Sequence, residues 1–165
     1  MSVLLKRQVL QVQYDIPLVD LGFGDLNIVI SGAEDCAPGH FYGPAVREYY
    51  LLHYIIKGEG IFRYRGHEYT LGKHKGFLIY PREITYYEAS KTNPWTYIWI
   101  GFSGTRAIEL LEQIGLGIDQ PIIDSPECEE LFNSIMATSD MKSGRELYLL
   151  SILYRIFSIL TKKWS

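Results

Sequence analysis

The sequence predicts a mainly β protein, in which residues 1–103 form a small barrel of the jelly-roll type and residues 104–165 add two or three helices. Two observations lead to this prediction. Up to about residue 102, apolar and polar residues alternate with a period of two, in short runs broken by glycine and proline. After Gly104 the apolar residues recur at helical spacing. No linker separates the two parts, so we expect one structural unit.

Six to eight strands are expected, and their spacing is typical of a jelly roll or a related barrel. We expect Gly66-His67 to form the turn of a hairpin between two of these strands. The strand-like runs lie at residues 26–31, 47–57, 60–65, 67–71, 76–80, 84–89 and 95–102.

The last of these runs carries an informative alternation. Trp95, Tyr97 and Trp99 are two residues apart, so in a strand their side chains share one face, while Ile98 and Ile100 share the other. Large rings with N–H and O–H groups are suited to a sugar, whose C–H face stacks on an aromatic ring and whose hydroxyls need hydrogen-bond partners. The alternative is that these rings only fill the barrel, and that Trp95 closes its mouth.

The C-terminal part contains three helical patterns. The first covers residues 105–114 and ends at a glycine. The second begins at Ser125, with Pro126 at its first position. The third begins at Ser143, where the spacing to Glu146 predicts a capping box.

The third helix is apolar nearly all round, which indicates burial on two sides. It is sandwiched between the second helix and the barrel, or one of its apolar stripes pairs with a second copy of the chain. The residues that we expect at such a dimer interface are Leu147, Leu150, Leu153, Tyr154 and Phe157.

Composition and charge exclude several classes of protein. The net charge is −3, with no basic stripe, so we do not expect this chain itself to contact DNA. No signal peptide and no apolar run of about 20 residues is present, which favours a cytoplasmic protein. Cys36 and Cys128 have no metal-ligand spacing and are expected to be free thiols.

Three motifs carry a resemblance to a known family. They are Gly58-Glu-Gly60, Gly76-Phe-Leu-Ile-Tyr-Pro81 and Pro94-Trp-Thr-Tyr-Ile-Trp-Ile-Gly-Phe102. Over nearly its whole length, the chain resembles the N-terminal effector-binding and dimerisation domain of AraC-family transcription regulators. The resemblance implies a cupin-like barrel that holds a small effector, often a sugar, and C-terminal helices that form a homodimer. It also implies a separate C-terminal helix-turn-helix domain that binds promoter DNA, which we expect to be missing from this sequence.

The resemblance also points to effector-binding residues. Tyr87, Tyr97 and Trp99 align with sugar-contacting positions of the family, although Tyr97 replaces a histidine of an arabinose-sensing member, so a different sugar is expected. We add Trp95 from the same strand face. Arg47 is expected to begin a strand, where its guanidinium would grip two hydroxyls or a carboxylate if it points into the barrel. The alternative is an arginine that faces solvent.

A metal site is not expected. Metal-binding cupins use a His-x-His pair, a following glutamate and a later histidine, whereas this chain has His40, Tyr42, Glu48 and Thr85 at the similar positions. Two imidazoles are therefore missing, and we expect neither a metal nor another cofactor. His40 remains a candidate polar contact to the effector. His53 lies inside an apolar strand and is expected to be a packed core residue.

These observations favour the ligand-sensing and dimerisation domain of a sugar-responsive, AraC-type transcription regulator, which is not an enzyme. We expect its N-terminal segment, residues 1–20, to fold over the barrel mouth or to form a simple edge strand. Two alternatives stay open. One is a metal-dependent cupin enzyme that acts on a sugar, and the other is a dimerisation module without an effector.

Overall fold

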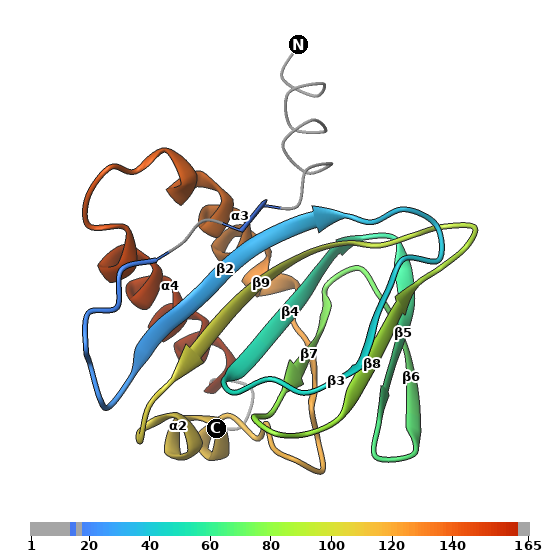
Figure 1. Cartoon of the computed structure of the whole chain (residues 1–165), viewed down its shortest axis with the longest axis horizontal. Coiled ribbons are helices and arrows are strands. Elements are labelled where there is room, and N and C mark those ends of the chain that lie inside the picture. Colours follow the sequence, from blue (N-terminus) through green and yellow to red (C-terminus); the bar gives the residue numbers. More distant parts are fainter. Residues whose placement is uncertain (1–13, 16–17, 162–165) are drawn as a thin grey trace.

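The computed structural model describes residues 14–15 and 18–161 and contains two antiparallel sheets that face each other (Figure 1). The larger sheet has the strand order β1-β2-β9-β4-β7-β10, and the smaller has the order β3-β8-β5-β6. The strands are β1 (Tyr14–Asp15), β2 (Asn27–Asp35), β3 (Phe41–Ala45), β4 (Tyr50–Lys57), β5 (Glu59–Tyr64), β6 (His67–Gly72), β7 (Lys75–Ile79), β8 (Thr85–Ala89), β9 (Thr96–Ser103) and β10 (Ile122–Asp124). The prediction of a mainly β, cupin-like barrel followed by helices is confirmed.

Each predicted strand run corresponds to a strand, but three described strands lie outside these runs. They are the two-residue edge strand β1, β3, whose Gly-Pro pair resembles a loop, and β10, which is too short to show a period. Arg47 does not begin a strand, because it lies between β3 and β4. The predicted hairpin turn is wrong by one residue: Arg65 and Gly66 are its two central residues, with φ of 50° and 76°, as a type I′ turn requires.

Strand β9 lies between β2 and β4 and is buried on both faces. Tyr97 and Trp99 belong to the core between the two sheets, whereas Ile98, Ile100 and Phe102 belong to the core between the larger sheet and the helices. The predicted alternation along this strand is therefore confirmed, and it separates two hydrophobic cores.

The helices lie against the outer face of the larger sheet (Figure 1). Phe132 of α3 stacks on Tyr54 of β4 at 4.5 Å between ring centroids, and the Tyr54 hydroxyl donates a hydrogen bond of 2.7 Å to the carbonyl of Ser125. The helical segments are α2 (Ala107–Gln113), α3 (Glu129–Ala137) and α4 (Arg145–Thr161), with 3-10 turns η1 (Pro126–Cys128) and η2 (Thr138–Asp140). No helix in this described part of the chain is long and apolar enough to cross a bilayer.

Helix α4 is buried on one side and open on the other. Leu153 and Phe157 lie in the core of the chain, so they are not available to a second copy. Leu147 and Tyr154 are 56% and 41% exposed, and Leu150 is partly buried. The residues predicted for one dimer interface therefore fall on two sides of the helix.

The start of α4 differs from the simple capping box that the sequence suggested. The carboxylate of Glu146 accepts a hydrogen bond of 3.0 Å from the backbone N–H of Val19. This contact connects the segment before β2 to the helix layer. The other residues of the predicted N-terminal arm, 1–13 and 16–17, lie outside the described residues, and Tyr14–Asp15 pair with β2 as an edge strand.

Trp95, just before β9, is completely buried and stacks on Phe77 at 5.8 Å between ring centroids. Gly60 of β5 lies directly against the indole: a Cβ atom at this position would be 2.5 Å from Trp95 ring carbon Cε3 and from the carbonyl oxygen of Glu88. Since neither the buried indole nor the backbone can move away easily, only glycine fits here.

We therefore expect Gly60→Ala to lower the free energy of unfolding by about 1–3 kcal/mol through overpacking. The matched control is Gly72→Ala on β6, where a Cβ would make an ordinary contact of 3.6 Å. The control should change stability by less than about 0.5 kcal/mol. Urea unfolding followed by tryptophan fluorescence measures both, and equal stability of the two variants would contradict the proposed contact.

Candidate functional site

A cavity of about 330 Å³ lies between the two sheets. Its wall comes from β2, β3, β4, β8 and β9 and from the segments next to β3. The lining residues are Ile30, Glu34, His40, Tyr42, Arg47, Leu51, His53, Tyr87, Tyr97 and Trp99.

Strand register brings these residues together, because residues opposite each other on neighbouring strands have adjacent side chains on the same face. Alternate positions of each strand then supply the next contact along the wall. The cross-strand pairs in the wall are Glu34 with Tyr97, His53 with Trp99, and Tyr42 with Tyr87.

Arg47 reaches the cavity from the segment between β3 and β4. Its guanidinium carbon lies 4.3 Å from the centroid of the Tyr42 ring, and its Nη1 and Nη2 donate long hydrogen bonds of 3.4 Å to the hydroxyls of Tyr49 and Tyr87. Within the described part of the chain, no carboxylate lies at ion-pair distance from this guanidinium. Because only phenol hydroxyls hold it, the Arg47 guanidinium keeps further N–H groups that can donate hydrogen bonds to a ligand.

Tyr87 and Tyr97 of the wall are neutral. Burial raises the pKa of Tyr87 to about 12, even though the Arg47 charge acts in the opposite direction. Burial also raises the pKa of Tyr97, and the nearby Cys36 adds to this effect. Both phenols therefore keep their protons at physiological pH and can donate as well as accept hydrogen bonds.

A second group of polar side chains lies where β2 leads into β3. His40 Nε2 is 3.4 Å from the carboxylate of Glu34, and the donor atoms of Glu34, Cys36 and His40 all lie within 4.8 Å of one another. This is the one cluster among residues 14–15 and 18–161 that offers three such atoms. Burial raises the pKa of the Cys36 thiol to about 12, and the charges of Glu34 and Asp35 also favour the protonated form.

That cluster is not the His-x-His arrangement of metal-binding cupins, since a carboxylate and a thiol accompany its single imidazole. A protonated thiol must also lose its proton before it can bind a metal. The absence of a metal stays a prediction, which elemental analysis can test.

Most of the residues expected at a ligand site from the sequence lie in this one cavity. Trp99, Tyr97, Tyr87, Arg47 and His40 line it. Trp95 does not, because its indole is completely buried in the core between the sheets. Whether the five bind a ligand stays a prediction.

The other lining residues were not predicted at a ligand site. His53 was expected in the core; it is indeed buried, but it also faces the cavity. The sequence does contain a pattern that indicates this position. Leu51, His53 and Ile55 are two residues apart on β4 and share one face, and His53 is the polar residue among them. Tyr42 was compared only with the metal ligands of cupins, and Glu34 was not expected at the site, because their strand partners were not known.

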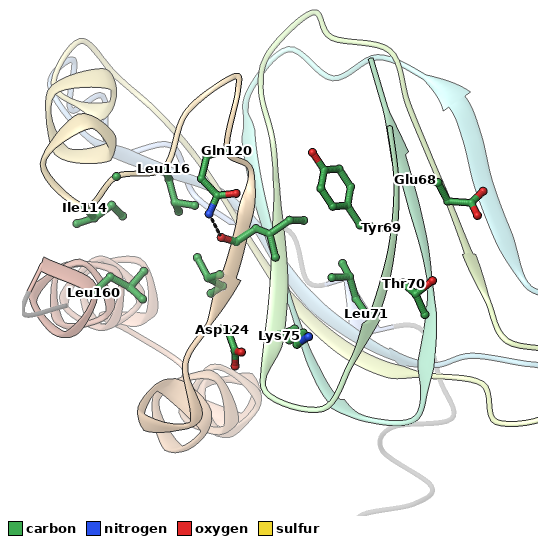
Figure 2. A pocket seen from close by; sticks show the side chains of 13 residues that line it. Glu68, Tyr69, Thr70, Leu71, Lys75, Ile114, Leu116, Gln120, Asp124 and Leu160 are labelled. Carbon is green, nitrogen blue, oxygen red and sulfur yellow. Dashed lines mark hydrogen bonds between the residues drawn. The ribbon is translucent and has the colours of Figure 1, made fainter. Parts of the chain in front are cut away.

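A larger hollow, of about 640 Å³, is an open groove outside the barrel (Figure 2). Tyr69 and Leu71 of the edge strand β6 line one side, and Leu116, Gln120 and Leu160 of α4 line the other. Tyr69 provides its single aromatic ring. The groove therefore lacks the enclosing set of rings that the smaller cavity has, and the smaller cavity is the better candidate for a ligand site.

The smaller cavity combines an indole face, three phenols, the two imidazoles of His40 and His53 and a guanidinium, together with the carboxylate of Glu34 beside His40. One cation and one anion balance, so this wall suits an uncharged ring with many hydroxyls.

Comparison with known proteins agrees with this architecture. The family model of the AraC-like ligand binding domain matches residues 27–157. The Msm operon regulatory protein of Streptococcus mutans is 32% identical over 151 residues, which cover 88% of this chain and 54% of that protein. The raffinose operon transcriptional regulatory protein RafR of Pediococcus pentosaceus is 38% identical over 87 residues, which cover 52% of this chain and 31% of that protein.

Among solved structures, apo ToxT from Vibrio cholerae has a similar fold, with a TM-score of 0.61 and 12% identity over 84% of this chain and 57% of that chain. This chain spans about half the length of the Msm operon regulatory protein. Because the family model covers most of the sequence, the chain belongs to the family of AraC-like ligand-binding domains.

Proposed function

We propose that the chain is the sensing and dimerisation domain of a transcription regulator that responds to a sugar. The observation that carries the proposal is the 330 Å³ cavity between the two sheets with Trp99, Tyr97, Tyr87 and Arg47 in its wall. The similarity to RafR, a regulator of a raffinose operon, supports a sugar as the effector.

The wall has the chemistry that a pyranose needs. Trp99 and Tyr97 meet at 81° with their centroids 5.7 Å apart, so they form a corner that supplies an aromatic face and a hydroxyl edge together. A sugar's C–H face would stack on the indole, while its hydroxyls would meet Tyr87, Arg47 and His40.

The proposed mechanism is allosteric. The effector would shift an existing equilibrium between two arrangements of the regulator, and it can do so only if it binds one arrangement better than the other. We propose that the N-terminal segment takes part in this change. Val19, whose N–H is bound by Glu146, connects the end of that segment to α4.

Promoter binding would belong to a helix-turn-helix domain outside this sequence, a proposal supported by the greater length of the relatives. Dimerisation would use the exposed face of α4. Of the residues first expected there, Leu147, Leu150 and Tyr154 remain candidates, because Leu153 and Phe157 are buried within the chain.

We expect isothermal titration with raffinose, lactose, arabinose, galactose and glucose to detect binding of at least one sugar, and Trp99→Ala to weaken that binding about tenfold or more, because the stacking surface is lost. The matched control is Tyr69→Ala, which removes the aromatic ring of the outer groove. It should leave the affinity unchanged. Loss of binding in Tyr69→Ala but not in Trp99→Ala would move the site to the groove, and no heat with any sugar would count against a sugar sensor.

For dimerisation, we expect the double variant Leu147→Asp, Tyr154→Asp to be folded but monomeric, since two carboxylates would be buried in the interface. Asn133→Asp is the control, because it adds a charge to an exposed position of α3. It should stay as dimeric as the parent. Sedimentation velocity at several concentrations distinguishes these outcomes, and a double variant that remains dimeric would show that the interface lies elsewhere.

A metal-dependent enzyme is the competing function, and the observation in its favour is the cluster of Glu34, Cys36 and His40. We expect purified protein to contain no stoichiometric iron, manganese, nickel or zinc by elemental analysis. One equivalent of metal that is lost in Cys36→Ser and retained in Cys128→Ser would instead support the enzyme.

A further inference from the structure

His53 is a buried polar residue in an aromatic surrounding. It is 2% exposed, and its ring stacks on Phe77 at 4.6 Å, with Tyr87 and Tyr97 each at 4.9 Å and Trp99 at 5.9 Å. Its Nδ1 is buried and has no hydrogen-bond partner among the described residues. Such an unsatisfied nitrogen disfavours the folded state, and a phenylalanine ring would occupy similar space without this disadvantage.

The imidazole is electrically neutral. Burial, and to a lesser extent the nearby charge of Arg47, holds the pKa of His53 well below the ordinary value of 6.5. A neutral imidazole has one nitrogen that donates and one that accepts a hydrogen bond. A sugar hydroxyl can both donate and accept, so it is a suitable partner for a neutral imidazole.

The size of the cavity limits how much of a sugar can enter. Its 330 Å³ correspond to the liquid volume of about eleven waters, and a hexopyranose has about a dozen non-hydrogen atoms, whereas a disaccharide has about twice as many. One pyranose ring fits. In a larger saccharide the remaining rings would extend past Tyr42, which is 40% exposed, and past His40, whose side chain is 39% exposed.

We propose that the cavity accepts a single pyranose residue and that His53 determines its specificity by hydrogen-bonding one ring hydroxyl. Trp99, the cross-strand neighbour of His53, would hold the sugar face, so that only one edge of the ring meets the imidazole. This inference depends on the proposed function, because it assigns the specificity contact of the same site.

The test compares the methyl pyranosides of galactose and glucose with their monodeoxy forms by titration calorimetry. Wild-type protein should bind one parent sugar and lose about ten- to hundredfold in affinity for one monodeoxy form, since the missing hydroxyl leaves a polar group unpaired. His53→Phe should bind the parent as weakly as wild type binds that deoxy form, and it should no longer distinguish the two. His67→Phe, the same change at an exposed hairpin position, should behave like wild type.

Two results would overturn the inference, and they differ in what they say of the proposed function. If His53→Phe keeps both the affinity and the discrimination, another residue reads the hydroxyl while the sugar-sensing function stands. If wild type binds neither the pyranosides nor any sugar of the wider panel, the function and the inference fail together.

A stability measurement checks that His53→Phe remains folded. In wild type the unfolded chain takes up a proton on this residue below about pH 6.5 and the folded chain does not, so the melting temperature should fall as the pH drops below 6.5. Arg47, Tyr87 and Tyr97, which surround the imidazole, do not titrate in this range. Between pH 7 and 5 the melting temperature of wild type should fall about 5 °C more than that of His53→Phe. An equal pH dependence would show that His53 is not held neutral.

Discussion

The structure depends on the burial of strand β9 on both of its faces. On one face, Tyr97 and Trp99 pack between the two sheets, and on the other, Ile98 and Ile100 pack against the helix layer. A shift of one residue in the pairing with β2 and β4 would exchange the two sets, placing phenol and indole groups under the helices and aliphatic side chains in the cavity. The same register therefore fixes both cores and the chemistry of the cavity wall.

The period of two along β9 could be predicted from the sequence, and so could the barrel and the row of rings inside it. The position of the cavity could not. Trp95 and Trp99 share a face and differ only in position along the chain, yet Trp95 is packed in the core and Trp99 lines the cavity. The difference arises from Gly60, a residue of another strand that leaves space for the Trp95 ring. Such long-range packing leaves no local period in the sequence.

Residues that are both buried and polar were equally difficult to predict. His53 lies in an apolar run, so its surroundings indicated a core residue, and its unsatisfied Nδ1 becomes visible only when its neighbours are known. For α4, a helix with two apolar stripes does not reveal which stripe its own chain covers. In the structure, Leu153 and Phe157 are buried in the core of the chain, whereas Leu147 and Tyr154 are exposed to solvent. The existence of the helix was predictable, and its outward face was not.

The cavity and α4 are connected through β2. Arg145, at the start of α4, is buried and donates hydrogen bonds of 3.2 Å to the hydroxyls of Ser31 and Thr138, while its Nη1 has no partner among the described residues. Ser31 lies three residues before Glu34, which lines the cavity on the same strand. A buried guanidinium held only by two hydroxyls is sensitive to small displacements, because its desolvation is poorly compensated. A sugar can change the position of α4 by this route only if it binds more tightly to one position of β2 than to another, so the specificity of the cavity and the response of the helix depend on the same strand.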